Sequence, residues 1–136
     1  MDTNVVVAGL RSPRGASAAL LDQALSRAFT PLLSVALVLE YEAVCIDPAQ
    51  RSVSGLGVAE VEALMSALCA VAEPVSPRYL WRPLLRDPAD EMVLEAAVNG
   101  GADALVTFNR RGFGVAPGKF GVAVLSPQEA LRRLSA

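Results

Sequence analysis

The stretch that decides the fold is residues 87–109, DPADEMVLEAAVNGGADALVTFN. Asp87 is a good helix N-cap and Pro88 fits the first helical position, so a helix begins here and ends at the glycine pair 100–101. Residues 104–108 follow as a short apolar run that is typical of a buried strand. The stretch therefore predicts a helix that leads directly into a strand, as in α/β proteins.

Outward from this unit, apolar runs continue to alternate with helical patterns. Short apolar or strand-like runs are expected at residues 5–7, 31–35, 104–108 and 122–125. The other helices are expected at 17–29, from the N-cap Ser34 to about Cys45, from Val58 to the Glu73-Pro74 pair, and after a capping box at 126–129. The alternation predicts an α/β fold, a three-layer α/β/α sandwich with a short, mainly parallel sheet. In such sheets, ligands bind beyond the carboxyl ends of the strands.

The composition excludes several classes of protein and site. A chain of 136 residues with 53% hydrophobic and 19% charged residues is not disordered, and we expect one domain over residues 1–136. The absence of histidine excludes a Ser-His-Asp triad, a Cys-His pair and a histidine-bound zinc ion. Cys45 and Cys69 lie too far apart to form a CxxC motif, so we expect both to be reduced and packed in apolar surroundings.

The charge and hydropathy patterns bear on location and partners. A net charge of −2 argues against a protein that coats DNA without specificity. The most apolar stretch, residues 31–46, contains Glu40 and Glu42 and is shorter than the roughly 20 residues of a spanning helix. Asp2 follows the initiator directly, which is unlike a signal peptide. We therefore expect a cytoplasmic protein with no membrane segment.

Polar residues stand out at four places in this apolar sequence. They are the triplet 2–4 (Asp-Thr-Asn), Glu40 within an apolar helix, Asp90 in the first turn of a helix, and the triplet 107–109 (Thr-Phe-Asn) at the end of a strand. Each also has an ordinary structural explanation: a solvated terminus, a water-facing side chain, a favourable helix-dipole interaction and a turn. Taken singly, none of them establishes a site.

In this order the four features resemble a known family. The triplet 2–4, the helical Glu40, the run DEMVLEAA at 90–97 and the run GGADALVTFN at 100–109 are similar to the PIN domain family, the metal-dependent ribonuclease fold of the VapC-type toxins. The nearest likeness is to the bacterial branch described as toxin components. The resemblance covers nearly the whole chain.

The resemblance implies a carboxylate site for Mg²⁺ or Mn²⁺. Asp2, Glu40 and Asp90 would be the catalytic, metal-binding acids, and hydrolysis by such a site needs no histidine. Glu42 is an alternative to Glu40, but the two lie about 200° apart around a helix, and the family places its acid at Glu40. The polar residues expected to support these ligands are Asn4, Thr107 and Asn109.

The expected substrate is RNA. Four arginines near predicted strand ends are candidates for binding its phosphates: Arg11, Arg14, Arg110 and Arg111. Tyr79 and Trp81 lie among Arg78, Arg82 and Arg86, an arrangement compatible with stacking on single-stranded RNA. It is equally compatible with a partner-binding or dimer surface.

The sequence departs from the family pattern at two places. A fourth acid is expected near Asn109 and Gly112, but neither residue ionises, and Asp103 precedes the strand and is expected at its opposite end. Only Met1 precedes Asp2, so the first strand is short at its start or the true start lies upstream.

Two main functions follow from the resemblance. The first is a metal-dependent endoribonuclease, the toxin of a toxin–antitoxin pair, with RNA as substrate, an antitoxin protein as partner and a homodimeric state. The alternative is a PIN-fold module with impaired catalysis that binds RNA or protein. An unrelated α/β domain is a third reading.

Overall fold

The computed structural model describes residues 1–76 and 84–135, in which helices predominate and strands are short. The helices are α1 (Thr3–Arg11), α2 (Ala16–Leu25), α3 (Val35–Ile46), α4 (Pro48–Ser54), α5 (Val58–Val71), α6 (Pro88–Asn99), α7 (Arg110–Phe113), α8 (Ala116–Lys119) and α9 (Pro127–Ser135). The strands are β1 (Leu32–Leu33), β2 (Glu73–Pro74), β3 (Ala104–Val106) and β4 (Ala123–Leu125).

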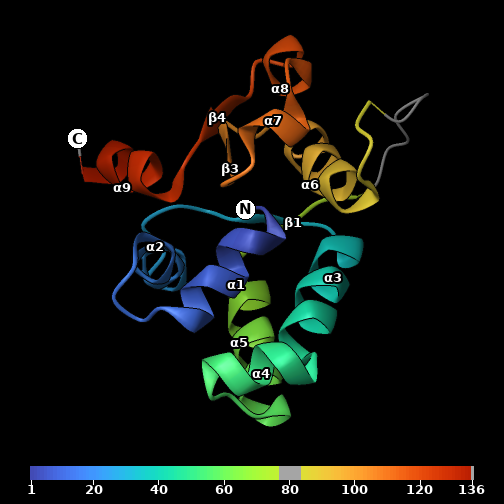
Figure 1. Cartoon of the computed structure of the whole chain (residues 1–136). Helices are drawn as coiled ribbons and strands as arrows, with labels where there is room; N and C mark the ends of the chain where they lie inside the picture. Colours follow the sequence, from blue (N-terminus) through green and yellow to red (C-terminus); the bar gives the residue numbers. More distant parts are fainter. Residues whose placement is uncertain (77–83, 136) are drawn as a thin grey trace.

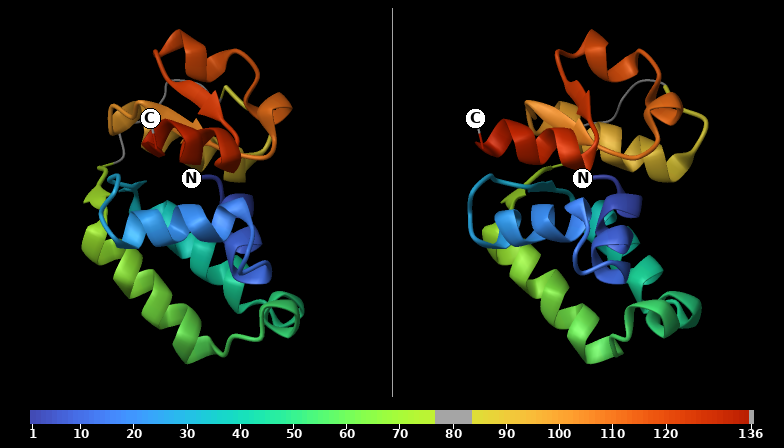
Figure 2. Two further views of the ribbon diagram at one scale, coloured as in Figure 1. Left: turned by 90° about the vertical axis from the view of Figure 1, so that its left-hand side faces the viewer. Right: turned by 60° about the vertical axis from the view of Figure 1, so that its left-hand side comes forward.

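The strands form two parallel pairs. β1 pairs with β2, with Leu32 opposite Glu73, and β3 pairs with β4, with Leu105 opposite Val124. Helices α1–α5 lie on one side of the molecule and the segment from α6 to α9 lies on the other, with the N-terminus between them (Figures 1 and 2). The predicted α/β character and the parallel pairing are confirmed. The described strands make two separate two-stranded sheets, so the three-layer sandwich stays a prediction.

The strand predicted at residues 5–7 is wrong, because these residues belong to helix α1. Val5 and Val6 are completely buried, and α1 packs against α2, α3 and α4. A helix that is covered on several faces has consecutive apolar residues, as a buried strand does, and a short run cannot distinguish the two. The extended residue is Asp2, at φ −64° and ψ 148°, and α1 begins directly after it.

The predicted helix starts are confirmed by their capping bonds. Ser34 Oγ accepts the N–H of Leu37 at 3.1 Å, and Asp87 Oδ1 accepts the N–H of Ala89 at 2.8 Å. The capping box over 126–129 is also present, with both reciprocal bonds formed. These caps fix where α3, α6 and α9 begin, and α6 in turn places its first-turn acids.

Three short helices escaped the sequence analysis: α4, α7 and α8. Asp47 caps α4 by accepting the N–H of Ala49 at 3.0 Å, and Pro48 is its first residue. Gly55 ends it in the left-handed conformation, at φ 75°. This start has the same Asp-Pro signal as α6, so α4 could have been predicted.

An aliphatic core holds α1, α3 and α6 around β3. Tyr41, Leu94 and Leu105 are among its fully buried members. Cys45 is buried, as expected, and this burial raises the pKa of its thiol to about 11. Cys69 was also expected to be packed in apolar surroundings, but it is exposed. Within residues 1–76 and 84–135, no single helix has the length and apolar character needed to cross a membrane. Helices α4 and α5 together meet these two criteria, but they are bent by 85° relative to each other.

Candidate functional site

The site lies where β3 ends and where α1 begins. The main-chain N–H of Asp2 donates to the carbonyl oxygen of Val106 at 2.8 Å, so the first acid lies beside the last residue of β3. The hydroxyl of Thr107 then donates to Asp2 Oδ2 at 2.6 Å. Both side chains are buried, and the bond joins residues 105 positions apart. The predicted polar residue at the strand end is therefore in direct contact with the first predicted acid.

The direction of the Thr107 hydroxyl proton is fixed by a second bond. Thr107 Oγ1 accepts the main-chain N–H of Asn109 at 2.9 Å, which occupies its acceptor side. Its single proton is therefore left for Asp2, and this bond fixes the orientation of the Asp2 carboxylate. Asp2 also stands at the positive N-terminal end of α1, although its side chain makes no capping bond there.

Helix α3 holds the same segment from the opposite side. The hydroxyl of Tyr41 donates to the carbonyl oxygen of Met1, the residue before the acid. Tyr41 is completely buried, and this burial, followed by the charges of Asp2 and Cys45, raises the pKa of its hydroxyl. The hydroxyl therefore stays protonated and remains a donor. Asp2 is thus placed by β3 on one side and by α3 on the other.

The second acid, Asp90, lies in the first turn of α6 and is buried. Burial raises its pKa above the ordinary value, and the negative charges of Asp2 and Asp87 raise it further. The effect of Asp2 on this pKa places the two predicted ligands within electrostatic range of one another. Within the described part of the chain, no hydrogen bond and no ion pair involves the Asp90 carboxylate.

The neighbouring acid, Glu91, has a structural role. Its carboxylate oxygens accept the main-chain N–H groups of Leu84 and Leu85, at 3.1 and 2.8 Å. These bonds fasten the segment that leads into α6. Of the two acids in this first turn, only Asp90 keeps its oxygens available for a ligand.

Gly112 is the residue that sequence analysis did not identify as part of the site. A Cβ atom at this glycine would lie 2.6 Å from Asp90 Oδ2 and 2.4 Å from Asn109 Nδ2, closer than real side chains allow. Asn109 Oδ1 accepts the N–H of Gly112 at 3.2 Å and caps α7. The close approach of α7 to Asp90 therefore requires glycine at position 112. The absence of an acid there was noted from the sequence, but its steric reason was not.

Glu40 is half-buried on α3, one residue before Tyr41, and Glu42 is half-buried one residue after it. Among residues 1–76 and 84–135, no three His, Cys, Asp or Glu side chains are grouped so that they could hold one ion. The structure thus pairs Asp2 with Asp90 and leaves the third ligand untested. Asn4 is exposed, and no hydrogen bond links it to Asp2, so its supporting role stays a prediction.

The arginines differ in their relation to this acid pair. Arg11 ends α1, which runs away from the site for about 12 Å at 1.5 Å per residue, and Arg14 follows it. Their expected position near the acids rested on the strand at 5–7, which the structure replaces by a helix. Arg110 forms an ion pair with Glu129 of α9, and Arg111 is exposed on α7. A role in binding phosphates is untested for all four.

The aromatic cluster and its arginines, Tyr79, Trp81, Arg78 and Arg82, lie outside the described residues. Asp103 is exposed just before β3, and Thr107 follows that strand. Asp103 is therefore separated from the acid pair by the length of β3.

The paired carboxylates fit a hard divalent cation. Mg²⁺ binds through one or two carboxylates and keeps several waters, which matches the two acids that the structure brings together. Burial, followed by the negative charges of Asp2 and Asp87, raises the pKa of Asp90, and a bound cation would favour the charged form of its carboxylate. The described residues supply no cationic side chain that pairs with either carboxylate. The donor set is therefore suited to one ion.

A family model described as "PIN domain" matches residues 1–111 of the chain. No curated protein and no solved structure gives a significant match.

Proposed function

The chain belongs to the PIN domain family, and from this membership we propose that it is a metal-dependent endoribonuclease. PIN domains are usually metal-dependent nucleases. The observation that carries the proposal is the acid pair itself. Asp2 and Asp90 are 88 positions apart in the sequence, yet the negative charge of Asp2 adds to the effect of burial in raising the pKa of Asp90.

In this proposal Asp2 and Asp90 hold Mg²⁺ or Mn²⁺, with Glu40 as a third, outer ligand. When bound, the ion would supply an activated water and would neutralise charge at the scissile phosphate. Thr107 holds the Asp2 carboxylate in one orientation through the bond from its hydroxyl. The exposed Arg111 lies on α7, the helix that packs against Asp90, and it is the arginine best placed to bind a substrate phosphate.

The test is cleavage of end-labelled single-stranded RNA in Mg²⁺, in Mn²⁺ and in a chelator. We expect cleavage only with metal, and we expect Asp2→Asn and Asp90→Asn to abolish it. Asp22→Asn is the matched control, because Asp22 is exposed on α2 and belongs to no site. Metal-independent cleavage, or full activity in Asp90→Asn, would contradict the proposal.

Among the described residues, no third acid is grouped with Asp2 and Asp90 so that the three could hold one ion. This arrangement favours one alternative function, a PIN-fold module that binds RNA or protein without cleaving it. Asn109 and Gly112, which stand where the family often has a further acid, support the same reading. Binding of the RNA with no cleavage in either metal would favour this module over the nuclease.

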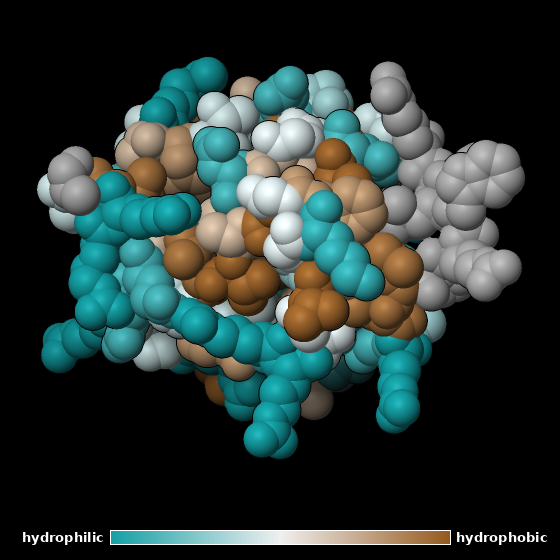
Figure 3. All heavy atoms as spheres, turned by 90° about the horizontal axis from the view of Figure 1, so that it is seen from above, coloured by the Kyte–Doolittle hydropathy of each residue, from teal (hydrophilic) through white to brown (hydrophobic). Residues whose placement is uncertain are grey.

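We further propose that the protein is the toxin of a toxin–antitoxin pair and that it forms a homodimer. Val35 and Leu39 are 77% and 60% exposed, and they lie one turn apart on α3, as expected for a partner-binding face. Hydrophobic side chains are also gathered at the centre of the face shown in Figure 3. Light scattering should give a dimer mass that Leu39→Glu reduces to that of a monomer. A growth defect on expression, reversed by a co-expressed antitoxin, would support the toxin role.

A further inference from the structure

Phe108 is the most exposed aromatic side chain in the part of the chain that the structure describes, at 57%. Aromatic residues make up only 5% of the sequence, and two of them, Tyr41 and Phe113, are almost fully buried in the core. Phe108 follows Thr107, whose hydroxyl donates to Asp2, the first acid of the candidate site. A large apolar side chain is therefore open to solvent one residue away from a direct contact of the carboxylate pair.

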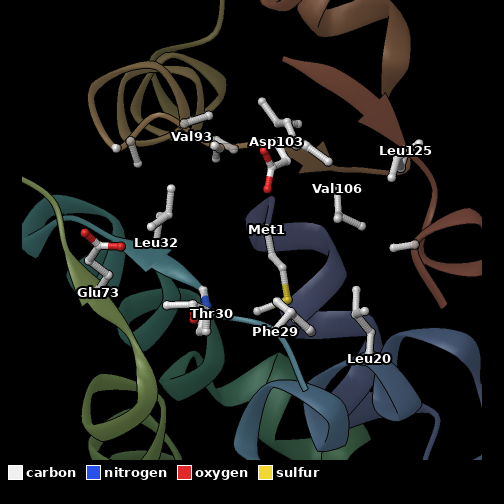
Figure 4. A pocket seen from close by; sticks show the side chains of 18 of the residues that line it. Met1, Leu20, Phe29, Thr30, Leu32, Glu73, Val93, Asp103, Val106 and Leu125 are labelled. Carbon is white, nitrogen blue, oxygen red and sulfur yellow. The ribbon is translucent and has the colours of Figure 1, made fainter. Parts of the chain in front are cut away.

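Apolar space is available near Phe108, but the side chain does not use it. A cavity of about 490 Å³ with mostly aliphatic walls lies beside β3, and Val106 and Leu125 line it (Figure 4). Phe108 comes only two residues after Val106, yet it is not among the residues that line this cavity. At this strand end the chain buries its aliphatic side chains and leaves the phenylalanine in solvent.

The main chain on both sides of Phe108 is held by hydrogen bonds. The N–H of Thr107 donates to the carbonyl oxygen of Leu125 at 2.9 Å, and the N–H of Asn109 donates to Thr107 Oγ1 at 2.9 Å. The side chain of Asn109 then caps α7 by accepting the N–H of Gly112. The ring of Phe108 is thus carried on a segment fastened to β4 and α7, so that little main-chain order is lost when a ligand binds to it.

The segment around Phe108 is positively charged. Residues 104–128 contain three cations and no Asp or Glu, whereas the whole chain has a net charge of −2. Arg110 is ion-paired with Glu129, and Arg111 is exposed on α7. Cations beside an exposed aromatic ring are the combination that binds single-stranded nucleic acids, because phosphates meet the cations while bases stack on the ring.

We propose that Phe108 is a substrate-binding residue on which one unpaired base of single-stranded RNA stacks. Because Thr107 links the main chain of Phe108 to Asp2, the stacked base holds the RNA strand beside the acid pair. Arg111, three residues further on, is exposed and binds the phosphates of the same strand. Stacking accepts every base but requires an unpaired one, so Phe108 selects single strands over duplexes without reading a sequence. The inference rests on the RNA substrate of the proposed function, but not on cleavage.

The test compares wild type with Phe108→Ala, Phe108→Leu and Phe108→Trp. The probe is a fluorescein-labelled single-stranded RNA of about 12 nucleotides, free or annealed to its complement, and binding is measured by anisotropy in chelator at low salt. Phe120→Ala is the matched control, because Phe120 is 46% exposed. Phe120 precedes the start of β4, whereas Phe108 follows the end of β3, and the two strands are parallel, so the two rings belong to opposite ends of the strand pair.

We expect Phe108→Ala to weaken binding of the single strand by about 5- to 150-fold, the range for loss of one stacked base. Phe108→Leu should lose nearly as much, because leucine has no π-face, and Phe108→Trp should bind as tightly as wild type. Phe120→Ala should bind normally, and the duplex should bind equally to every variant. Tm should not change, since an exposed ring adds little to stability. In Mn²⁺, Phe108→Ala should raise KM by the same factor and leave kcat nearly unchanged.

Wild-type affinity for the single strand in Phe108→Ala or in Phe108→Leu would overturn the stacking proposal. A lower molecular mass of Phe108→Ala in light scattering, with RNA affinity unchanged, would make the ring a protein contact instead. Binding that depends on Phe108 without cleavage in either metal would support stacking and reject the nuclease. Metal-dependent cleavage with an unchanged KM in Phe108→Ala would do the reverse, and a wild-type protein that binds no RNA would reject both.

Discussion

Replacing Gly112 with alanine should disable the candidate site while leaving the fold intact. The added Cβ atom would lie 2.6 Å from Asp90 Oδ2, whereas ordinary van der Waals contact begins at 3.4 Å. The carboxylate must therefore retreat by about 0.8 Å, the difference between these distances. Asn109 Nδ2, at 2.4 Å, must also move, but Asn109 is exposed and has room to do so.

The expected loss follows from this displacement. A misplacement near 1 Å can lower an enzyme's rate about 100-fold, so we expect Gly112→Ala to cleave RNA roughly 50- to 100-fold more slowly. Calorimetric titration with Mn²⁺ should show a parallel loss of affinity. The free energy of unfolding should fall by no more than about 1 kcal/mol, at the low end of the range for overpacking, because one of the two neighbours can swing into solvent.

Gly118→Ala is the matched control. Gly118 lies in the neighbouring short helix α8, and a Cβ atom there would have no other atom within 4 Å. Both variants make the same chemical change in a short helix, so they differ in the contacts of the new Cβ atom with Asp90 and Asn109. Cleavage and Mn²⁺ affinity at the wild-type level in Gly112→Ala would refute the assignment of Asp90 to the site.

Three further predictions concern the groups around the acids. Thr107→Val removes the donor to Asp2 and should lower the free energy of unfolding by roughly 1.5–3 kcal/mol in urea titrations, whereas Thr107→Ser should restore most of it. The raised pKa of Asp90 means that folding disfavours its charge, so stability should rise as pH falls through the folded pKa towards the ordinary value of 3.8. In chelator at neutral pH, Asp90→Asn should therefore have a higher Tm than wild type, and it should not bind Mn²⁺. The pKa of the Met1 amino group is lowered from 8.0 to about 6, so the unfolded chain binds more protons between these values and the free energy of unfolding should rise by about 2 kcal/mol from pH 6 to 8. A chain acetylated at this group should lack the rise.

Local signals predicted much of the fold. The starts of α3 and α6 were identified from Ser34 and Asp87, because a capping bond depends on residues within one turn. The strands β3 and β4 were recognised as apolar runs between turn residues. The run at residues 5–7 was misassigned because three consecutive valines are typical of a buried strand and are too few to show a helical period.

The acids of the candidate site were predicted from the sequence, but most of the contacts around them were not. The pairing of Asp2 with Asp90 was inferred from a family pattern, since nothing local connects two residues so far apart. The Thr107 hydrogen bond and the steric demand at Gly112 depend on side-chain orientation and on close approach between elements, which residue order does not encode. The ion pair of Arg110 with Glu129 likewise depends on the start of α9 lying near the start of α7.

The bond between Thr107 and Asp2 also determines when the site can form. Asp2 is made among the first residues, whereas Thr107 comes 105 positions later and is itself held by Leu125 of β4. During synthesis the first acid leaves the ribosome without its hydroxyl donor, and the pair assembles only after nearly the whole chain has emerged. For a protein proposed to cleave RNA, this order keeps the nascent chain inactive while it is still attached to the RNA-rich machine that makes it.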